Sequence, residues 1–170
     1  MAEDCIPPAF NPLRLMARTA PYFQRSQAAR ARRAKTLLLP MPRTSADELS
    51  LQVHIALDAM RRGKGCTNAT QTLCQAMILV GLLAELGYGT ATYEQMQSAE
   101  AIISAAFDRG RDSDVWRFDD GDFEQFASIV TTYDTQLQRA PMSAIAEASN
   151  RLDRFRAGES FEEIAGRRRQ

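Results

Sequence analysis

From Ser45 onward, the pattern of apolar and polar positions has the period of an α-helix. Apolar residues recur every three or four positions with polar residues between them, which is typical of helices that bury one face. Pro141 and glycines such as Gly63, Gly87 and Gly158 separate these segments, as residues that end helices do. The pattern predicts five helices, over residues 45–62, 69–86, 93–109, 122–139 and 142–157.

Several of the predicted helix starts carry residues that cap free backbone N–H groups. In a capping box, a Ser, Thr or Asn is followed three residues later by Glu or Gln, and each side chain accepts a hydrogen bond from the other residue's backbone. An acidic cap is favourable as well, because the N-terminal end of a helix carries partial positive charge. The expected caps are Ser45 with Glu48, Asn68 with Gln71, Thr92 with Gln95, and Asp119 or Asp120 before the fourth helix.

The second segment, 69–86, differs from the others because apolar residues lie on almost every side of it. Such a helix belongs at the centre of a bundle, where no side faces water. Within it, Cys74 is expected to be a small buried side chain, and Gly81 to allow a neighbouring helix to approach closely. The sequence therefore predicts an all-α fold, an antiparallel bundle of four to five helices over residues 44–158.

Residues 1–43 have a different character. They contain six of the seven prolines and eight basic residues against two acidic ones, a net charge of +6, whereas the rest of the chain carries −6. Few backbone donors and no sustained apolar period predict a disordered basic tail. Translation starting at Met16 or Met41 instead of Met1 is an alternative that would shorten it. At the other end, residues 159–170 are expected to form a short capped turn and a basic C-terminus.

The basic residues at the two ends are the candidate nucleic-acid contacts. One interpretation is an arm that neutralises phosphates without reading sequence, and the other, which we favour, is a solvated linker. The candidate residues are Arg25, Arg30, Arg32, Arg33, Lys35, Arg167, Arg168 and Arg169.

A glycine-flanked lysine, Lys64, lies between the first two predicted helices, in the stretch AMRRGKGCTNAT. A P-loop needs a strand before it and a Ser or Thr directly after the lysine, so that amides, ammonium and hydroxyl converge on the phosphates. Here a helix precedes, and Gly65 follows the lysine. The stretch is therefore expected to be a turn.

Seven acidic residues between Asp108 and Glu124 raise the alternative of a metal site. No register of this segment supplies the oxygen ligands of an EF-hand, so we expect neither a metal nor a cofactor. Trp116 and Phe118 are instead expected to hold the loop against the core. The single histidine, His54, lies one helical turn from Asp58, and we expect a contact between these two side chains.

The three cysteines, Cys5, Cys66 and Cys74, form no CxxC pair, which favours free thiols in a reducing, cytoplasmic compartment. A Cys–His nucleophile pair stays open, since such pairs meet in space rather than in sequence. The longest apolar run, Ala76 to Ala84, is far shorter than the ~20 residues of a membrane span. We expect no membrane contact and no enzymatic activity.

The stretches LQVHIALDAMRRGKG, LAELGYG, VWRFDDGDFE and YDTQLQRAPMSAIAEASNRLDRFRAG resemble short helical proteins of bacterial plasmids and other mobile elements, often labelled Fis-type transcriptional regulators. The resemblance covers about residues 43–158, and its markers are architectural. It implies a context, a bacterial mobile element, more than an activity. We expect a non-enzymatic protein that acts through a protein partner, with a DNA-associated regulator as the alternative and an enzyme third. Homodimerisation through a leftover helix face stays open.

Overall fold

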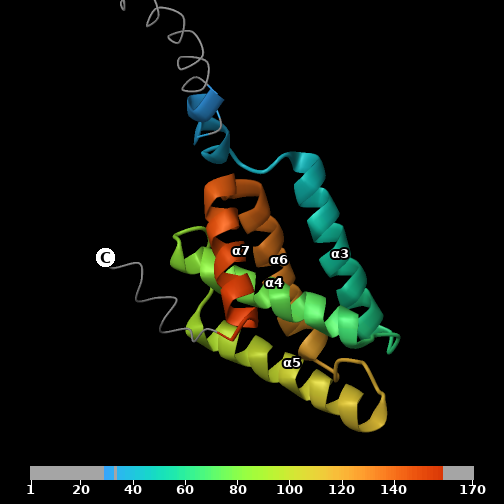
Figure 1. Ribbon diagram of the computed structural model, residues 1–170. Helices are drawn as coiled ribbons and strands as arrows, with labels where there is room; N and C mark the ends of the chain where they lie inside the picture. The colour runs from blue at the N-terminus through green and yellow to red at the C-terminus, as the bar shows by residue number, and fades with distance from the viewer. Residues whose placement is uncertain (1–28, 33, 159–170) are drawn as a thin grey trace, which may run out of the picture. The chain divides into compact units, whose positions relative to one another are not determined.

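The computed structural model describes residues 29–32 and 34–158, and the chain divides into two compact units, Met1–Thr36 and Leu37–Gln170 (Figure 1). Residues 29–32 and 34–37 are helical, and the hydroxyl of Thr36 donates to the carbonyl oxygen of Arg32 at 2.9 Å. The segment predicted to be a disordered tail therefore includes a helical stretch. No proline occurs between Pro21 and Pro40, and the alanines and arginines there favour a helix. The unit that holds the bundle also begins at Leu37 rather than at residue 44.

The second unit is all-α, as predicted. Its helices are α3 (Arg43–Arg61), α4 (Thr67–Glu85), α5 (Tyr93–Ser113), α6 (Asp122–Arg139) and α7 (Met142–Arg156). Within the described residues there is no β-strand, only one isolated bridge between Pro40 and Pro141. None of the helices in that part of the chain is both long and apolar enough to cross a membrane.

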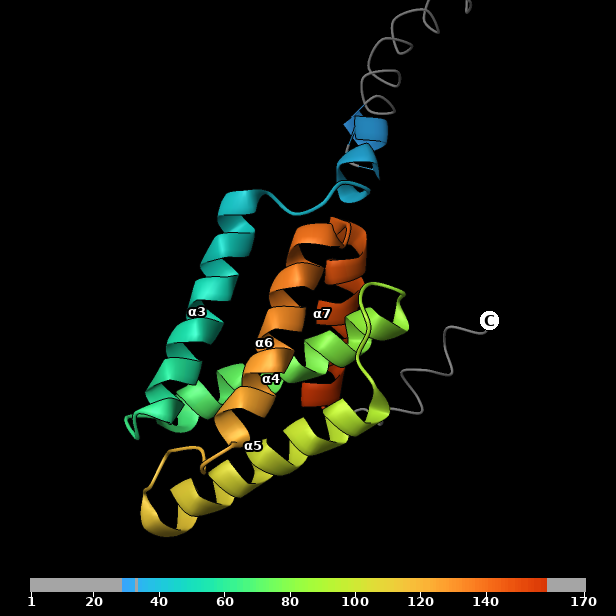
Figure 2. The same cartoon turned by 180° about the vertical axis from the view of Figure 1, so that it is seen from behind.

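The five helices form two sets that cross (Figures 1 and 2). Helices α6 and α7 run antiparallel, joined by a short turn, and α3 runs antiparallel to α6. Helices α4 and α5 are antiparallel to each other and lie across the first set. Helix α4 contacts all four of the others, which confirms its predicted place at the centre.

Two apolar clusters surround α4. The larger one fills the space among α3, α4, α5 and α6, and the smaller one joins the C-terminal half of α4 to α7. A fully buried Leu, Met or Phe side chain stabilises the fold by about 1.5–3 kcal/mol. The largest apolar side chains with almost no exposed surface are Met60, Leu73, Leu82, Leu83 and Phe126.

Only one of the predicted caps is formed as expected. Thr92 and Gln95 make the complete capping box at the start of α5. Helices α3, α4 and α6 have no side-chain cap and begin after Pro42, Cys66 and Gly121.

The predictions for Ser45, Asn68, Asp119 and Asp120 are therefore wrong, and neighbouring backbone contacts explain two of these starts. Near α4, the N–H of Gly65 donates to the carbonyl of Trp116 at 3.2 Å, so the chain is already oriented when the helix begins at Thr67. Before α6, the carboxylate of Asp122 accepts from the N–H of Asp119, and Gly121 adopts a left-handed conformation.

The loop between α5 and α6 is anchored as predicted. Phe118 is buried against Phe126, and its N–H donates to the carbonyl of Met60. The indole of Trp116 covers Gly110, where a Cβ atom would lie 2.4 Å from the ring. Helix α5 continues to Ser113 instead of ending at the predicted residue 109, and Asp114 after it adopts a left-handed conformation.

The predicted close approach at Gly81 is also present. A Cβ atom on Gly81 of α4 would lie 3.2 Å from the methyl group of Met96 on α5.

Candidate functional site

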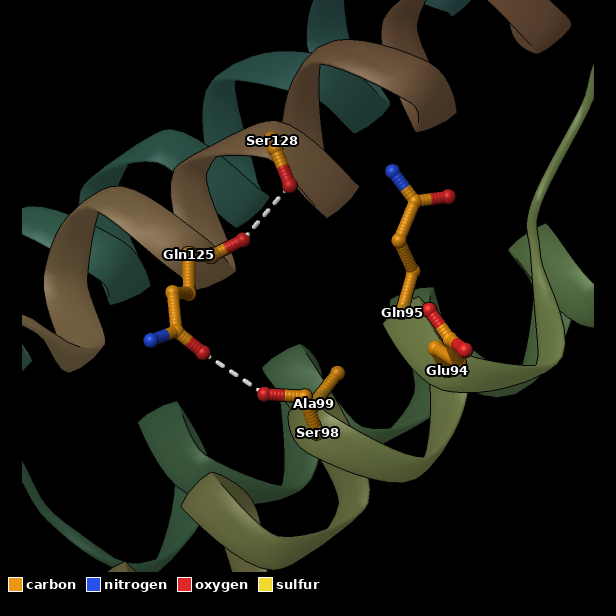
Figure 3. Close-up of a pocket in the computed structure, with 6 residues that line it drawn as sticks. All are labelled: Glu94, Gln95, Ser98, Ala99, Gln125 and Ser128. Atoms are coloured by element: carbon orange, nitrogen blue, oxygen red, sulfur yellow. Dashed lines mark hydrogen bonds between the residues drawn. The ribbon is translucent and has the colours of Figure 1, made fainter.

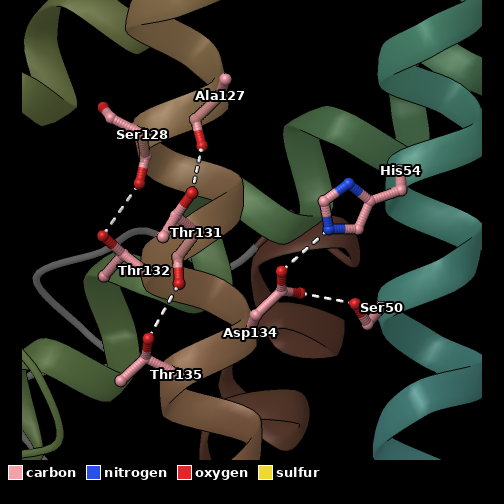
Figure 4. A network of polar contacts seen from close by, with 8 residues as sticks. All are labelled: Ser50, His54, Ala127, Ser128, Thr131, Thr132, Asp134 and Thr135. Carbon is pink, nitrogen blue, oxygen red and sulfur yellow. Dashed lines mark hydrogen bonds and ion pairs between the residues drawn. The ribbon is translucent and has the colours of Figure 1, made fainter.

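The polar residues that link α3 to α6 form the first candidate site (Figure 4). Asp134 of α6 lies between two residues of α3: it accepts a hydrogen bond from the Ser50 hydroxyl at 2.6 Å, and its other oxygen lies 2.8 Å from Nε2 of His54. The predicted contact between His54 and Asp58 is wrong, because Asp58 pairs with Arg62 at 2.9 Å. The imidazole of His54 faces α6, so it contacts Asp134 on that helix instead of Asp58 on its own helix.

Serine, histidine and aspartate are the residues of a hydrolase triad, but their order here differs. In a triad the imidazole lies between the hydroxyl and the carboxylate, so that it can take the proton from the nucleophile. In this cluster the carboxylate lies in the middle, and the Ser50 hydroxyl donates to Asp134. This geometry ties two helices together and leaves His54 in no position to activate Ser50.

A column of hydroxyl groups runs along α6 on a different side from Asp134 (Figure 4). Each of these hydroxyls donates to a carbonyl oxygen of its own helix, three or four residues earlier, at 2.6–3.0 Å. Because each hydroxyl donates its proton within the helix, its oxygen can still accept a hydrogen bond, and the column carries no charge. The residues are Ser128, Thr131, Thr132 and Thr135.

A small pocket lies beside this column, between α5 and α6 (Figure 3). Its volume is about 230 Å³, which is below the usual size of a small-molecule site. The Ser98 hydroxyl donates to the side chain of Gln125 at 2.6 Å, and Ser128 donates to the Gln125 carbonyl. Because these groups already bind one another, the pocket offers few free polar groups to a ligand.

Three of the seven acidic residues between Asp108 and Glu124 pair with arginines of the same segment. Asp119 pairs with Arg109 at 2.6 Å, and Asp108 and Asp112 both pair with Arg111. The hydrogen bond that Arg111 donates to Asp112, and the negative charge of that carboxylate, raise the pKa of the Arg111 guanidinium. Among the residues that the structure describes, no group of three or more His, Cys, Asp or Glu side chains is placed to hold a metal ion.

The two described cysteines differ in environment. Cys66 is exposed, whereas Cys74 is half-buried in a groove among α4, α5 and α7. Burial, and secondarily the charge of Glu100, raise the pKa of the Cys74 thiol, which lowers its fraction of reactive thiolate. His54 contacts Asp134, and of the two cysteines that the structure describes, neither forms a pair with His54. Cys5 lies outside the described residues.

One feature that the sequence analysis missed is a run of exposed leucines, Leu37 to Leu39, at the start of the second unit. Leu38 is 71% exposed. The run is tied to the bundle, because the N–H of Met142 donates to the carbonyl of Leu39 at 2.8 Å and Pro40 pairs with Pro141. In the sequence, the only indication of this surface is three consecutive leucines beside a proline, and they lie within the predicted tail, residues 1–43.

The predicted nucleic-acid contacts are only partly described. Arg30, Arg32 and Lys35 lie on the helical stretch and are exposed, and within the described residues their side chains form no ion pair. Those that fall outside the described residues are Arg25, Arg33, Arg167, Arg168 and Arg169.

Comparisons with known proteins do not assign the chain to a family. It matches no protein-family model, and neither the curated proteins nor the solved structures give a significant match.

Proposed function

We propose that this chain is a small, non-enzymatic regulatory or accessory protein of a bacterial mobile element that acts by binding a protein partner. The observation that carries the proposal is the run of exposed leucines at Leu37–Leu39, held to the bundle through Met142 and Pro141. Adjacent large apolar side chains in water are costly, and on folded proteins they commonly mark interaction surfaces.

The residues before the leucines indicate the kind of partner. Arg30, Arg32 and Lys35 are exposed cations without an acidic neighbour in the described part of the chain. Exposed cations pair with acidic side chains, and adjacent exposed leucines fit an apolar groove. We therefore propose an acidic partner with such a groove.

The test compares the full chain with the double variant Leu37→Ser/Leu38→Ser. Both are used to capture proteins from nuclease-treated lysates of bacteria that carry the gene, with Tyr93→Ser as a control at another large exposed side chain. A protein retained by the wild type and by the control is then purified and titrated by calorimetry against the wild type, the control and the double variant. We expect at least a tenfold loss of affinity in the double variant, which is about 1.4 kcal/mol. Equal binding by the double variant would contradict the proposal.

The alternative function is a DNA-associated regulator, and the same three exposed cations support it, since they form no ion pair with any residue that the structure describes. Cations that neutralise phosphates release counterions, so binding weakens steeply as salt rises. In mobility-shift titrations across salt concentrations, changing Arg30, Arg32 and Lys35 to Gln should lower the log–log slope by about 0.9 for each lost phosphate contact. If the full chain fails to shift DNA at low salt, this alternative is excluded.

A further inference from the structure

The outward face of α3 carries two large apolar side chains that nothing in the described structure covers. Leu51 and Ile55 are 59% and 60% exposed and lie four residues apart, on one side of the helix. The opposite side, with Val53, Leu57 and Met60, is buried in the larger cluster. Helix α3 therefore has an apolar patch facing away from the bundle.

Charged residues continue this patch in both directions. Glu48 precedes Ile55 by seven residues, and Arg62 follows Ile55 by seven. Seven residues are nearly two helical turns, so both lie on the same side as Ile55. The stripe is therefore acidic at one end, apolar in the middle and basic at the other end, with equal spacing about Ile55.

We propose that a second copy of this chain covers the patch, with the two α3 helices packed antiparallel around a two-fold axis at Ile55. An antiparallel copy places Ile55 against its equivalent and Glu48 against the partner's Arg62, and symmetry repeats the ion pair on the other side. A two-fold interface uses one surface twice, so the surface must complement itself, and this stripe does.

The charges also select the register. Moving the axis to lie between Leu51 and Ile55 would bring Glu48 opposite the partner's Asp58, and like charges repel. Within one chain Arg62 already pairs with Asp58 at 2.9 Å, but both side chains are half exposed or more. An exposed pair of this kind contributes only about 0.3–0.5 kcal/mol, so the guanidinium can turn to the partner at little cost.

The interface is small, so the association should be weak. With two apolar side chains and one ion pair per copy, the buried area lies at the lower end of the range for specific interfaces. We expect a dissociation constant in the micromolar range. The dimer uses residues other than Leu37–Leu39, so it stands apart from the proposed partner binding: the Leu37→Ser/Leu38→Ser variant should dimerise normally.

Sedimentation velocity over a range of concentrations tests the dimer directly. The wild type should move from 19.0 kDa toward twice that mass as concentration rises. Ile55→Glu should stay monomeric, and Tyr93→Glu, at a position that is 79% exposed on α5, should dimerise like the wild type. Circular dichroism checks that each variant keeps its helix content. A wild type that stays monomeric at every concentration overturns the proposal, as does unchanged dimerisation of Ile55→Glu.

A charge reversal tests the register. Glu48→Arg and Arg62→Glu should each weaken the dimer about tenfold, because each places like charges together. The double variant Glu48→Arg/Arg62→Glu should restore it. These residues lie ~21 Å apart along their own helix, so restoration requires contact between copies. If the double variant is as weak as the single ones, the antiparallel arrangement at Ile55 is wrong.

Discussion

The side-chain amide of Gln136 on α6 donates a hydrogen bond to the carbonyl oxygen of Tyr88 at 2.8 Å. The same nitrogen lies 3.0 Å from the carbonyl oxygen of Val80 on α4, so one buried side chain joins α6 to α4 and to the turn that follows it. Gly89 completes the contact: its φ is +83°, and a Cβ there would lie 3.1 Å from Cγ of Gln136. The Gly-Tyr-Gly turn is thus shaped by a residue nearly 50 positions further along the chain.

Changing Gln136 to Leu should destabilise the protein. The substitution removes both hydrogen bonds and leaves the buried carbonyl oxygens without their donor. Leaving a buried polar group without its partner costs about 1–3 kcal/mol of stability. We expect the lower end of that range, because Oε1 of Gln136 is itself buried without a partner and its removal offsets part of the loss. Urea unfolding measures the effect. Gln138→Leu, at an exposed position on the same helix, is the matched control and should change stability little.

Gly110→Ala should destabilise the protein although it lies within a helix. Replacing a helical glycine by alanine normally stabilises by about 1 kcal/mol. Here the new methyl group would lie 2.4 Å from the indole of Trp116, so the ring must move. Trp116 is the only tryptophan, and its fluorescence emission should shift to longer wavelength as the ring becomes exposed. Ser104→Ala, at an exposed position on the same helix, should leave the emission unchanged.

Asp134→Ala should loosen the contact between α3 and α6. The change removes the hydrogen bond from Ser50 and the contact with His54 together, and we expect a loss of about 1–2 kcal/mol in unfolding experiments. Asp58→Ala removes an exposed pair within α3 only, so its effect should be several times smaller. Equal effects of the two variants would show that the cluster at Asp134 does not stabilise the helix pair.

Stability should fall at alkaline pH, in part through Tyr133. Burial, and secondarily the charge of Asp134, raise the pKa of the Tyr133 phenol in the folded state. Above the unfolded pKa of about 10, the unfolded chain releases this proton more readily than the folded one, so rising pH favours unfolding. Tyr133→Phe should therefore show a shallower decline between about pH 9 and 11. Tyr93→Phe, at an exposed position, should follow the wild type.

Much of the architecture follows from the sequence by itself, because helical periodicity and helix ends are local properties. The five helices, the central place of the nearly all-apolar α4, the ends at Gly63, Gly87 and Gly158, and the anchoring of Trp116 and Phe118 were all predicted from neighbouring residues.

Contacts between helices were decided only by the tertiary structure. Two helices start two residues earlier than predicted, α3 after Pro42 and α4 after Cys66. Near the start of α4, the Trp116 carbonyl accepts a hydrogen bond from Gly65 and so sets the path of the chain. His54 binds Asp134 instead of Asp58, and Gln136 reaches the turn at Tyr88. Periodicity shows which face of a helix is buried, but not which residue of another helix comes to lie against it. That depends on how α4 and α5 cross α3, α6 and α7, and the crossing results from packing the whole core at once.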